Sequence, residues 1–214
     1  MLFRSVYNYM GFGLVLTGLV AYGAAESGLY TFMAQTPLLL WVVVLSPLAL
    51  VLLLSFRIDK MSLGAAQAAF WTYAAVVGLS LAGVFLMYTG VSIARTFFIT
   101  AATFLAMSLF GYTTRTDLAR FRSFLMMGLI GVIIASAVNL FLASSTLQLV
   151  ISVVGVIVFV GLTAYDTQRI KEIYLAADGT VVAGKKTIMG ALTLYLDFLN
   201  LFLLLLQLTG NRRS

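Results

Sequence analysis

Residues 188–209 read IMGALTLYLDFLNLFLLLLQLT, an apolar run of the length that crosses a bilayer as a single helix. Asp197 is the only charged residue in this run. Burying a carboxylate at membrane depth costs about 3 kcal/mol or more, so such residues usually face a partner or a water-filled cavity. The run therefore predicts a transmembrane helix and directs the search for function to Asp197.

The polar side chains of this run fall on one side of the predicted helix when successive residues are placed about 100° apart. They are Thr193, Asp197, Asn200 and Gln207. A helix surrounded by lipid gains nothing from collecting its polar groups on one face. We therefore expect the last helix to lie at the centre of a helical bundle.

The whole chain has the composition of an integral membrane protein. Of its 214 residues, 62% are hydrophobic and 9% are charged, whereas soluble domains carry about 25% charged residues. The mean hydropathy is +1.08. Apolar runs of about 20 residues predict an all-α, multi-pass protein with seven transmembrane helices in one domain, residues 1–214. The predicted spans are residues 6–25, 38–56, 64–88, 91–112, 123–143, 147–166 and 188–209.

Several classes of function are excluded by what the sequence lacks. It has no cysteine and no histidine, which excludes disulfides, thiolate catalysis, the commonest metal ligand and the usual general base. Intramembrane aspartyl proteases use a Gly-x-Gly-Asp motif, but Leu194 and Leu196 occupy the glycine positions before Asp197. The net charge of +6 is spread over short gaps rather than gathered in one basic patch. We therefore expect no enzyme activity, no cofactor and no nucleic-acid partner.

The lysines and arginines predict the orientation in the membrane. If the amino terminus is inside, ten of the 13 basic residues lie on the cytoplasmic side, as the positive-inside rule requires. We therefore expect a cytoplasmic amino terminus, although the tail pair Arg212 and Arg213 departs from the rule. The ten residues are Arg4, Arg57, Lys60, Arg115, Arg120, Arg122, Arg169, Lys171, Lys185 and Lys186.

Asp166 is the natural partner for Asp197, because it ends the preceding predicted span and both approach the cytoplasmic side in this topology. Asp197 lies about 14 Å below the start of its helix, at about 1.5 Å per residue. Asp166 reaches that depth if its own helix continues past Arg169 to about residue 174. The alternative is an interfacial Asp166 paired with Arg169, one turn along the helix.

Tyr165-Asp166 thus ends one predicted helix, and Leu194-Tyr195-Leu196-Asp197-Phe198-Leu199-Asn200-Leu201-Phe202 lies in the last. Together with Gly111-Tyr112-Thr113-Thr114 and the seven spans, these motifs resemble the transmembrane Bax inhibitor motif family, the Bax inhibitor-1-like proteins. The resemblance implies a seven-helix fold with the last helix at its centre. For the bacterial branch, which this chain is similar to, it implies a pH-sensitive calcium leak channel in the cytoplasmic (inner) membrane.

The resemblance also implies roles for particular residues. Asp166 and Asp197 would form a hydrogen-bonded pair near the cytoplasmic mouth, and protonation of the pair would select the closed or the open state. A basic residue would lie beside the pair, and the residues available for this contact are Arg57 and Lys60.

The chemistry of two neighbouring carboxyl groups agrees with such a gate. In a partly dry site they cannot both ionise cheaply, so they share a proton and titrate as a coupled unit. Loss of that proton leaves like charges that repel each other and attract a cation. Calcium takes about six to eight oxygen ligands. The site offers two carboxylates, with Thr163, Asn200 and Thr193 as candidates along the cation path, and backbone carbonyls and water, which predicts weak and transient calcium binding. Conduction requires such weak binding.

Two other functions stay open. Coupled carboxylates also serve proton relays, so the protein could be a proton-coupled calcium or cation exchanger, which a proton gradient would drive uphill. Some members of the resembled family are described as regulators of other membrane proteins. A non-conducting regulator, with a quality-control membrane protease as its partner, would show a stable protein complex and no ion flux.

Overall fold

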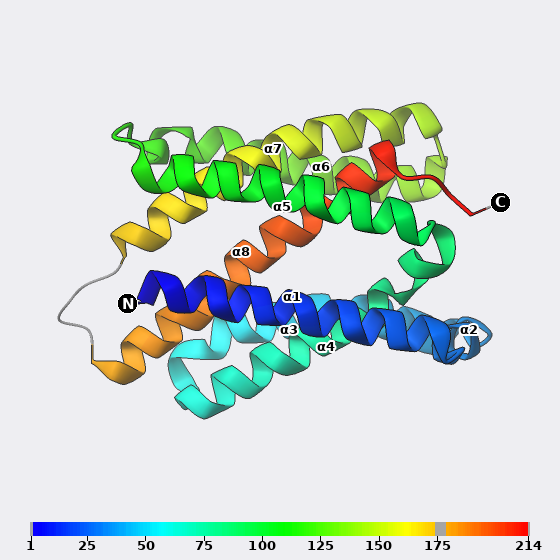
Figure 1. Ribbon diagram of the computed structural model, residues 1–214, viewed down its shortest axis with the longest axis horizontal. Helices are drawn as coiled ribbons and strands as arrows, with labels where there is room; N and C mark the ends of the chain where they lie inside the picture. Colours follow the sequence, from blue (N-terminus) through cyan, green and yellow to red (C-terminus); the bar gives the residue numbers. More distant parts are fainter. Residues whose placement is uncertain (1, 174–178, 214) are drawn as a thin grey trace. The chain divides into compact units, whose positions relative to one another are not determined.

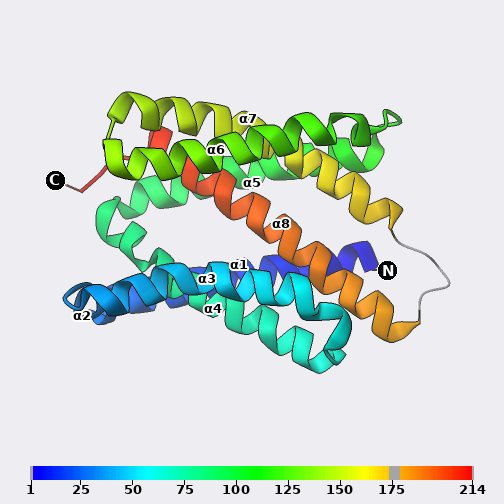
Figure 2. The same cartoon turned by 180° about the vertical axis from the view of Figure 1, so that it is seen from behind.

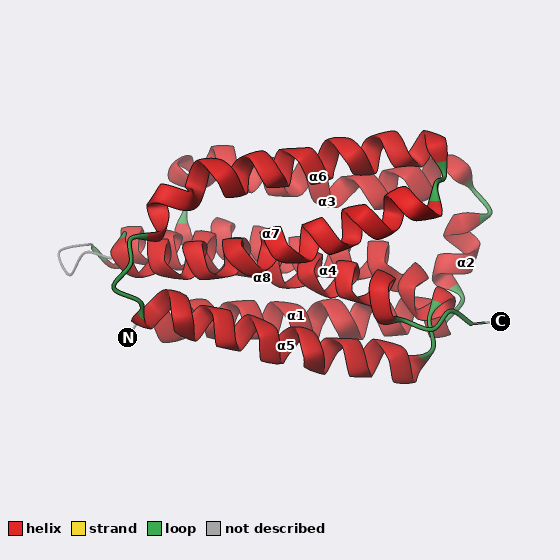
Figure 3. Cartoon of the chain, turned by 90° about the horizontal axis from the view of Figure 1, so that it is seen from above, coloured by secondary structure: helices red, strands yellow, loops and turns green. Residues whose placement is uncertain are grey.

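The computed structural model describes residues 2–173 and 179–213, and every named element in these ranges is a helix (Figure 3). The prediction of an all-α protein is therefore confirmed. The elements are α1 (Leu2–Glu26), α2 (Leu29–Ala34), α3 (Pro37–Arg57), the 3-10 helix η1 (Ile58–Lys60), α4 (Leu63–Met87), α5 (Gly90–Thr113), the 3-10 helix η2 (Leu118–Phe121), α6 (Arg122–Leu142), α7 (Ser145–Glu172) and α8 (Thr180–Thr209).

Six candidate membrane spans occur among the described residues, each long and apolar enough to cross a bilayer. They are Pro37–Lys60, Leu63–Met87, Gly90–Thr113, Leu118–Leu142, Ser145–Glu172 and Thr180–Thr209. The protein is thus a multi-pass membrane protein. The predicted first span, residues 6–25, lies within α1, but α1 is not one of the six, so the count of seven is not confirmed. Asn8, Thr17 and several glycines make α1 less apolar than the others.

The described residues form two compact units, each with its own packing (Figures 1 and 2). Unit 1 contains residues 2–89, 179–195 and 212–213, and unit 2 contains residues 90–173 and 196–211. α8 therefore contributes Thr180 to Tyr195 to unit 1 and its remaining turns to unit 2. Of the six spans α8 is the most buried, because 67% of its 18-residue apolar stretch is buried, as expected for a helix that packs against several others. The single domain over residues 1–214 stays a prediction.

In unit 1 the main helix pair is α1 and α4, which lie side by side (Figure 1). A glycine makes the close approach possible, because a Cβ atom on Gly78 of α4 would lie 2.7 Å from the Thr17 carbonyl oxygen of α1. α3 packs on the same helix α4, and the short α2 contacts both α1 and α3. The sequence had predicted no helix between residues 25 and 38, where α2 lies.

Pro47 lies inside α3 and removes the backbone hydrogen bond that the Val43 carbonyl would accept. Two hydroxyl groups replace it. Ser46 Oγ donates to the Val43 oxygen at 2.9 Å, and Ser80 Oγ of α4 reaches the same oxygen at 2.7 Å. Satisfying a freed carbonyl through side-chain hydroxyls is how an apolar environment tolerates proline within a helix.

In unit 2, α7 packs against both α5 and α6. The α5 contact depends on Gly111, where a Cβ atom would lie 2.9 Å from the backbone carbonyl carbon of Ala164. α7 begins at a regular cap, since Ser144 Oγ accepts a hydrogen bond from the Leu147 amide at 3.2 Å. α7 also continues beyond Asp166 to Glu172, as pairing with Asp197 requires. The predicted end of this helix near residue 174 lies outside the described residues.

Candidate functional site

Asp166 of α7 and Asp197 of α8 both belong to unit 2 and are both buried, with 8% and 5% of their surface exposed. Their carboxyl groups lie within hydrogen-bonding reach of each other. The Oδ2 atom of Asp197 is completely buried and has no hydrogen-bond partner. Both acidic residues that the sequence singled out are therefore buried in unit 2, and their pairing stays a prediction.

Apolar packing on both sides of Asp197 holds this part of α8 in place. Phe198 stacks edge-on against Phe104 of α5, with ring centroids 5.5 Å apart. One and two turns further along, Leu201 and Leu204 enter a buried cluster with α7 residues that include Phe159. Because buried side chains of this size leave little free volume, Asp197 has a defined position relative to α5 and α7.

Residues with hydroxyl groups on α5 and α7 lie near Asp166. Thr163 is fully buried, one turn before Asp166, and its hydroxyl donates to the Phe159 carbonyl at 2.8 Å. Thr167, next to Asp166, lies 3.4 Å from the Ser108 hydroxyl of α5. Ser108 and Thr167 were not predicted as site residues, because their proximity depends on how α5 packs on α7.

The alternative partner of Asp166 is also near, since the charge of Arg169 acts on the Asp166 carboxylate. Arg169 itself is exposed, whereas Asp166 is buried. Both sequence-based hypotheses about Asp166 therefore describe real neighbours. Asp197 lies on a different helix, α8, so pairing with it would add a polar link to the apolar contacts between α7 and α8.

Beyond Asp166, two side chains of α7 fasten the end of α5 and the chain that follows it. Gln168 Oε1 accepts a hydrogen bond from the Leu118 amide at 2.7 Å, and Gln168 Nε2 donates to the Thr116 carbonyl at 2.9 Å. Lys171 Nζ donates to the Tyr112 carbonyl at 2.8 Å and lies over the Tyr112 ring. The sequence analysis missed both contacts, although Gln168 is polar among buried residues.

Asn200 lies one turn beyond Asp197, is half-buried, and donates from Nδ2 to the Leu196 carbonyl at 2.8 Å. It also lines a cavity of about 470 Å³ whose other polar lining residues are Ser136, Gln148 and Gln207. Gln207 was predicted on the polar face of the last helix. Ser136 and Gln148 come from α6 and α7, and the sequence analysis did not find them.

Thr193, Arg57 and Lys60 belong to unit 1. The Thr193 hydroxyl donates to the Met189 carbonyl at 3.0 Å, whereas Arg57 at the end of α3 and Lys60 in η1 are exposed. A contact between either basic residue and the aspartates stays a prediction. Near Lys60, Lys185 of α8 donates to the Asp59 carbonyl at 2.8 Å.

Tyr195 anchors the unit 1 part of α8, two residues before Asp197. Its side chain is fully buried, and its hydroxyl lies 2.6 Å from the Thr17 hydroxyl of α1. Its ring packs edge-on against Phe70 and Tyr73 of α4. One residue of the motif Leu194 to Phe202 therefore fixes α8 to α1 and α4.

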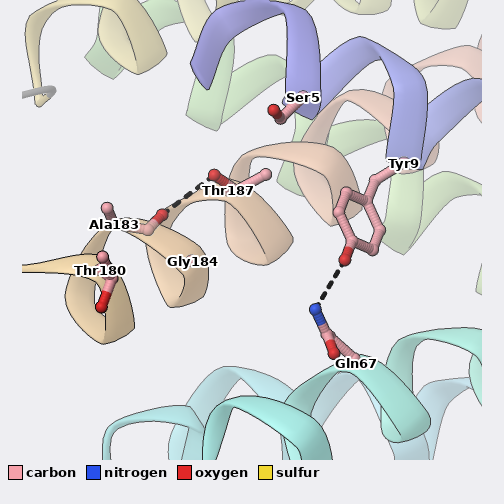
Figure 4. Close-up of a pocket in the computed structure, with 7 residues that line it drawn as sticks. All are labelled: Ser5, Tyr9, Gln67, Thr180, Ala183, Gly184 and Thr187. Carbon is pink, nitrogen blue, oxygen red and sulfur yellow. Dashed lines mark hydrogen bonds between the residues drawn. The ribbon is translucent and has the colours of Figure 1, made fainter. Parts of the chain in front are cut away.

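Unit 1 has a polar cavity of about 280 Å³ between α1, α4 and the start of α8 (Figure 4). Gln67 Nε2 donates to the Tyr9 hydroxyl at 2.7 Å across it, and Thr187 is tied to its own helix through the Ala183 carbonyl. The remaining lining residues are Ser5, Thr180 and Gly184. None of the described residues that line this cavity is acidic.

Among residues 2–173 and 179–213, no group of three or more histidine, cysteine, aspartate or glutamate side chains could hold a metal ion. Asp166 and Asp197 supply two carboxylates, and neighbouring hydroxyl and carbonyl oxygens are neutral. This set of hard oxygen ligands suits calcium better than a transition metal, and it contains only two charged ligands.

Comparison with known proteins identifies the family. All of residues 1–214 match the family described as inhibitor of apoptosis-promoting Bax1. A Rickettsia prowazekii protein is 49% identical over 210 residues, covering 98% of this chain and 89% of that protein. The inner membrane protein YbhL of Escherichia coli is 48% identical over 211 residues, covering 97% of this chain and 90% of YbhL. A Streptococcus pyogenes membrane protein is 36% identical over 211 residues, with coverage of 97% and 91%. The chain is therefore a membrane protein of the Bax inhibitor-like family.

Proposed function

We propose that this protein is a pH-sensitive calcium leak channel, gated by a proton that Asp166 and Asp197 share. The observation that supports the proposal is that both carboxyl groups are buried on different helices of unit 2, α7 and α8, and act on each other electrostatically. Membership of the family supports a membrane function but does not by itself select calcium.

The gate follows from the hydrogen-bonding capacity of carboxyl groups. An ionised carboxylate only accepts hydrogen bonds, so two ionised aspartates have no donor between them, and one proton supplies it. With the proton present, Asp166 and Asp197 join α7 to α8. Without it, two negative charges repel each other, and the buried Oδ2 atom of Asp197 becomes an uncompensated charge. Loss of the proton therefore favours separation of the helices and entry of a cation.

The ligand set favours passage of calcium over retention of it. Two carboxylates attract a divalent ion, and Thr163 and Asn200 can add neutral oxygens within one turn of either aspartate. Only two of these ligands are charged, and affinity for calcium falls as the number of charged ligands falls, so we expect weak binding. Weak binding of this kind lets an ion leave, as conduction requires.

We place the protein in a bacterial cytoplasmic membrane with its amino terminus inside. The name of YbhL as an inner membrane protein supports the location. The distribution of lysine and arginine in the sequence supports the orientation. In this orientation the aspartates lie toward the cytoplasmic side, so cytoplasmic pH would set their protonation.

The test is calcium influx into proteoliposomes at about pH 6 and about pH 8, with calcium-sensitive dye inside. The wild-type protein should admit calcium about tenfold faster at the higher pH, because the shared proton is lost there. Asp166→Asn and Asp197→Asn should remove this pH dependence. Asp117→Asn is the matched control, since Asp117 is an exposed carboxylate of unit 2 that accepts from the Ala119 amide at 2.8 Å.

The same preparation distinguishes the alternatives. An exchanger would accumulate calcium against its gradient when a proton gradient is imposed, whereas a leak only dissipates the calcium gradient. A non-conducting regulator would give no influx at either pH and would copurify with a protein partner. Influx that is unchanged in both aspartate variants would refute the proposed gate.

A further inference from the structure

The cavity of unit 2, whose lining is mostly apolar with four polar residues, lies in the part of the chain that should be surrounded by lipid. Its volume is about 470 Å³, which is large enough for several water molecules. Ser136 of α6, Gln148 of α7, and Asn200 and Gln207 of α8 contribute hydroxyl and amide groups to its lining. Three helices therefore direct polar groups toward one cavity.

The cavity runs along α8 away from the aspartates. Asn200 and Gln207 are seven residues apart, which is two helical turns and about 10 Å. Asn200 in turn lies one turn beyond Asp197. The cavity thus extends from the neighbour of the aspartates toward the end of α8, where α6 ends and α7 begins.

Exposed amide groups in its lining are accommodated better by water than by hydrocarbon. Gln207 is exposed, and its Oε1 accepts hydrogen bonds from Gln148 Nε2 at 2.6 Å and Ser152 Oγ at 3.0 Å. Ser136 is exposed as well. An amide that faces hydrocarbon carries a desolvation cost that it does not carry in water.

Hydrogen bonds keep the far end of the cavity in shape. Asn139 Nδ2 donates to Gln148 Oε1 at 3.0 Å, and Asn139 Oδ1 accepts from the Ser144 amide at 3.0 Å. Asn139 is buried. The link between α6 and α7 is therefore tied to the glutamine that contacts Gln207.

We propose that this cavity is a water-filled vestibule through which calcium moves between one membrane face and Asn200, beside the aspartate gate. The proposal rests on the proposed function. In this proposal, calcium crosses the part of the membrane beyond Asp197 between α6, α7 and α8. The Gln148–Gln207 hydrogen bond then forms the narrowest point, at the far end of the vestibule. The competing occupant is a lipid chain, because Ile133 and Leu140 also line the cavity.

The first test is thiol labelling, for which the chain is suited because it has no cysteine. Ser136→Cys lies in the cavity lining. Ile134→Cys is the matched control at nearly the same depth of α6, exposed but outside the lining. A charged, water-soluble methanethiosulfonate should modify Ser136→Cys about ten times faster or more, because the reactive thiolate forms in water and not in hydrocarbon. A lipid-soluble maleimide should modify both, which shows that both thiols are present.

Equal, slow labelling of the two variants by the charged reagent would overturn the proposal and favour a lipid chain in the cavity. The second test is calcium influx after labelling. A cationic adduct on Ser136→Cys should lower influx at about pH 8 by about tenfold, and more than an anionic adduct of similar size, because a fixed positive charge repels calcium. The same charged reagents applied to Ile134→Cys, which they should modify only slowly, should leave influx unchanged.

The two proposals fail in different ways. If Ser136→Cys is labelled rapidly and influx stays pH-dependent and unaltered, the vestibule does not carry calcium, while the aspartate gate stands. If the unlabelled protein admits no calcium at either pH, the proposed function fails and the calcium path fails with it. Rapid labelling would then show only that the cavity holds water.

Discussion

The hydroxyl groups of Tyr195 and Thr17 lie 2.6 Å apart, which joins α8 to α1 two residues before Asp197. Thr17 Oγ1 also lies 2.8 Å from the Ala74 carbonyl oxygen and 2.9 Å from the Gly13 carbonyl oxygen. Since a carbonyl oxygen can only accept, the Thr17 hydroxyl donates its one proton there. Tyr195 is therefore the donor to Thr17. The position of α8 in unit 1 depends on this buried contact.

The first prediction concerns that contact. Tyr195→Phe should lower the free energy of unfolding by about 1 kcal/mol, since buried hydrogen bonds between membrane helices contribute about this much. Thr17→Val should cost more, because it leaves the Tyr195 hydroxyl buried without an acceptor. Unfolding in mixed detergent micelles measures the free energy of unfolding of both variants. The double variant should lose less stability than the sum of the two single losses. Strictly additive losses would show that the two hydroxyl groups do not interact.

The second prediction concerns the contact between α5 and α7 near the aspartates. Gly111→Ala should destabilise the protein by about 1–3 kcal/mol, because the new methyl group would collide with the Ala164 backbone, which cannot move aside alone. Gly131→Ala on α6 is the control. A Cβ atom there meets nothing within 4 Å, so the variant should gain about 0.5–1 kcal/mol from the better helix former. Equal melting temperatures for the two variants would contradict the close packing.

The third prediction concerns Gln168. Gln168→Leu should cost about 1–3 kcal/mol, because the Leu118 amide loses its acceptor in a buried position. Hydrogen exchange should speed up at Leu118 itself and leave the middle of α7 protected. Gln168→Glu keeps the oxygen that accepts this bond and should retain more of the protection than Gln168→Leu. Unchanged exchange at Leu118 in Gln168→Leu would count against this role.

The sequence predicted the parts of the fold that depend on local pattern. Apolar runs located the six spans that the structure supports, and the helical period placed Asp197 and Asn200 on one side of α8. Asp166 can reach the membrane depth of Asp197 only if its helix continues past Arg169, and on this ground the sequence predicted the extension of α7. Helix ends were less accurate, because Lys185 and Lys186 are polar enough to end an apolar run yet lie within the first turns of α8.

Contacts between distant helices could not be predicted, because they depend on the rotation and register of each helix against its neighbour. Nothing in the sequence near Gln148 indicates that it bonds Gln207, and nothing near Ser80 indicates that its hydroxyl reaches the carbonyl freed by Pro47. Asp166 and Asp197 were found together only because ionisable residues are rare in such helices, so each needed a partner. The short helix α2 was missed because residues 29–34 are too few for a periodic pattern.

The fourth prediction is the central one, that Asp166 and Asp197 share one proton. Infrared difference spectroscopy of the protein in lipid measures protonated carboxyl groups directly. The pair of Asp166 and Asp197 should lose one protonated carboxyl group as the pH is raised. Calcium influx should rise over the same pH range. Asp197→Asn should abolish the spectral change and Asp166→Asn should alter it, because a lone buried Asp197 no longer shares its proton, whereas Asp117→Asn should preserve it. A protonated carboxyl signal that persists unchanged in Asp166→Asn, or influx that rises without any loss of that signal, would contradict the shared proton as the gate.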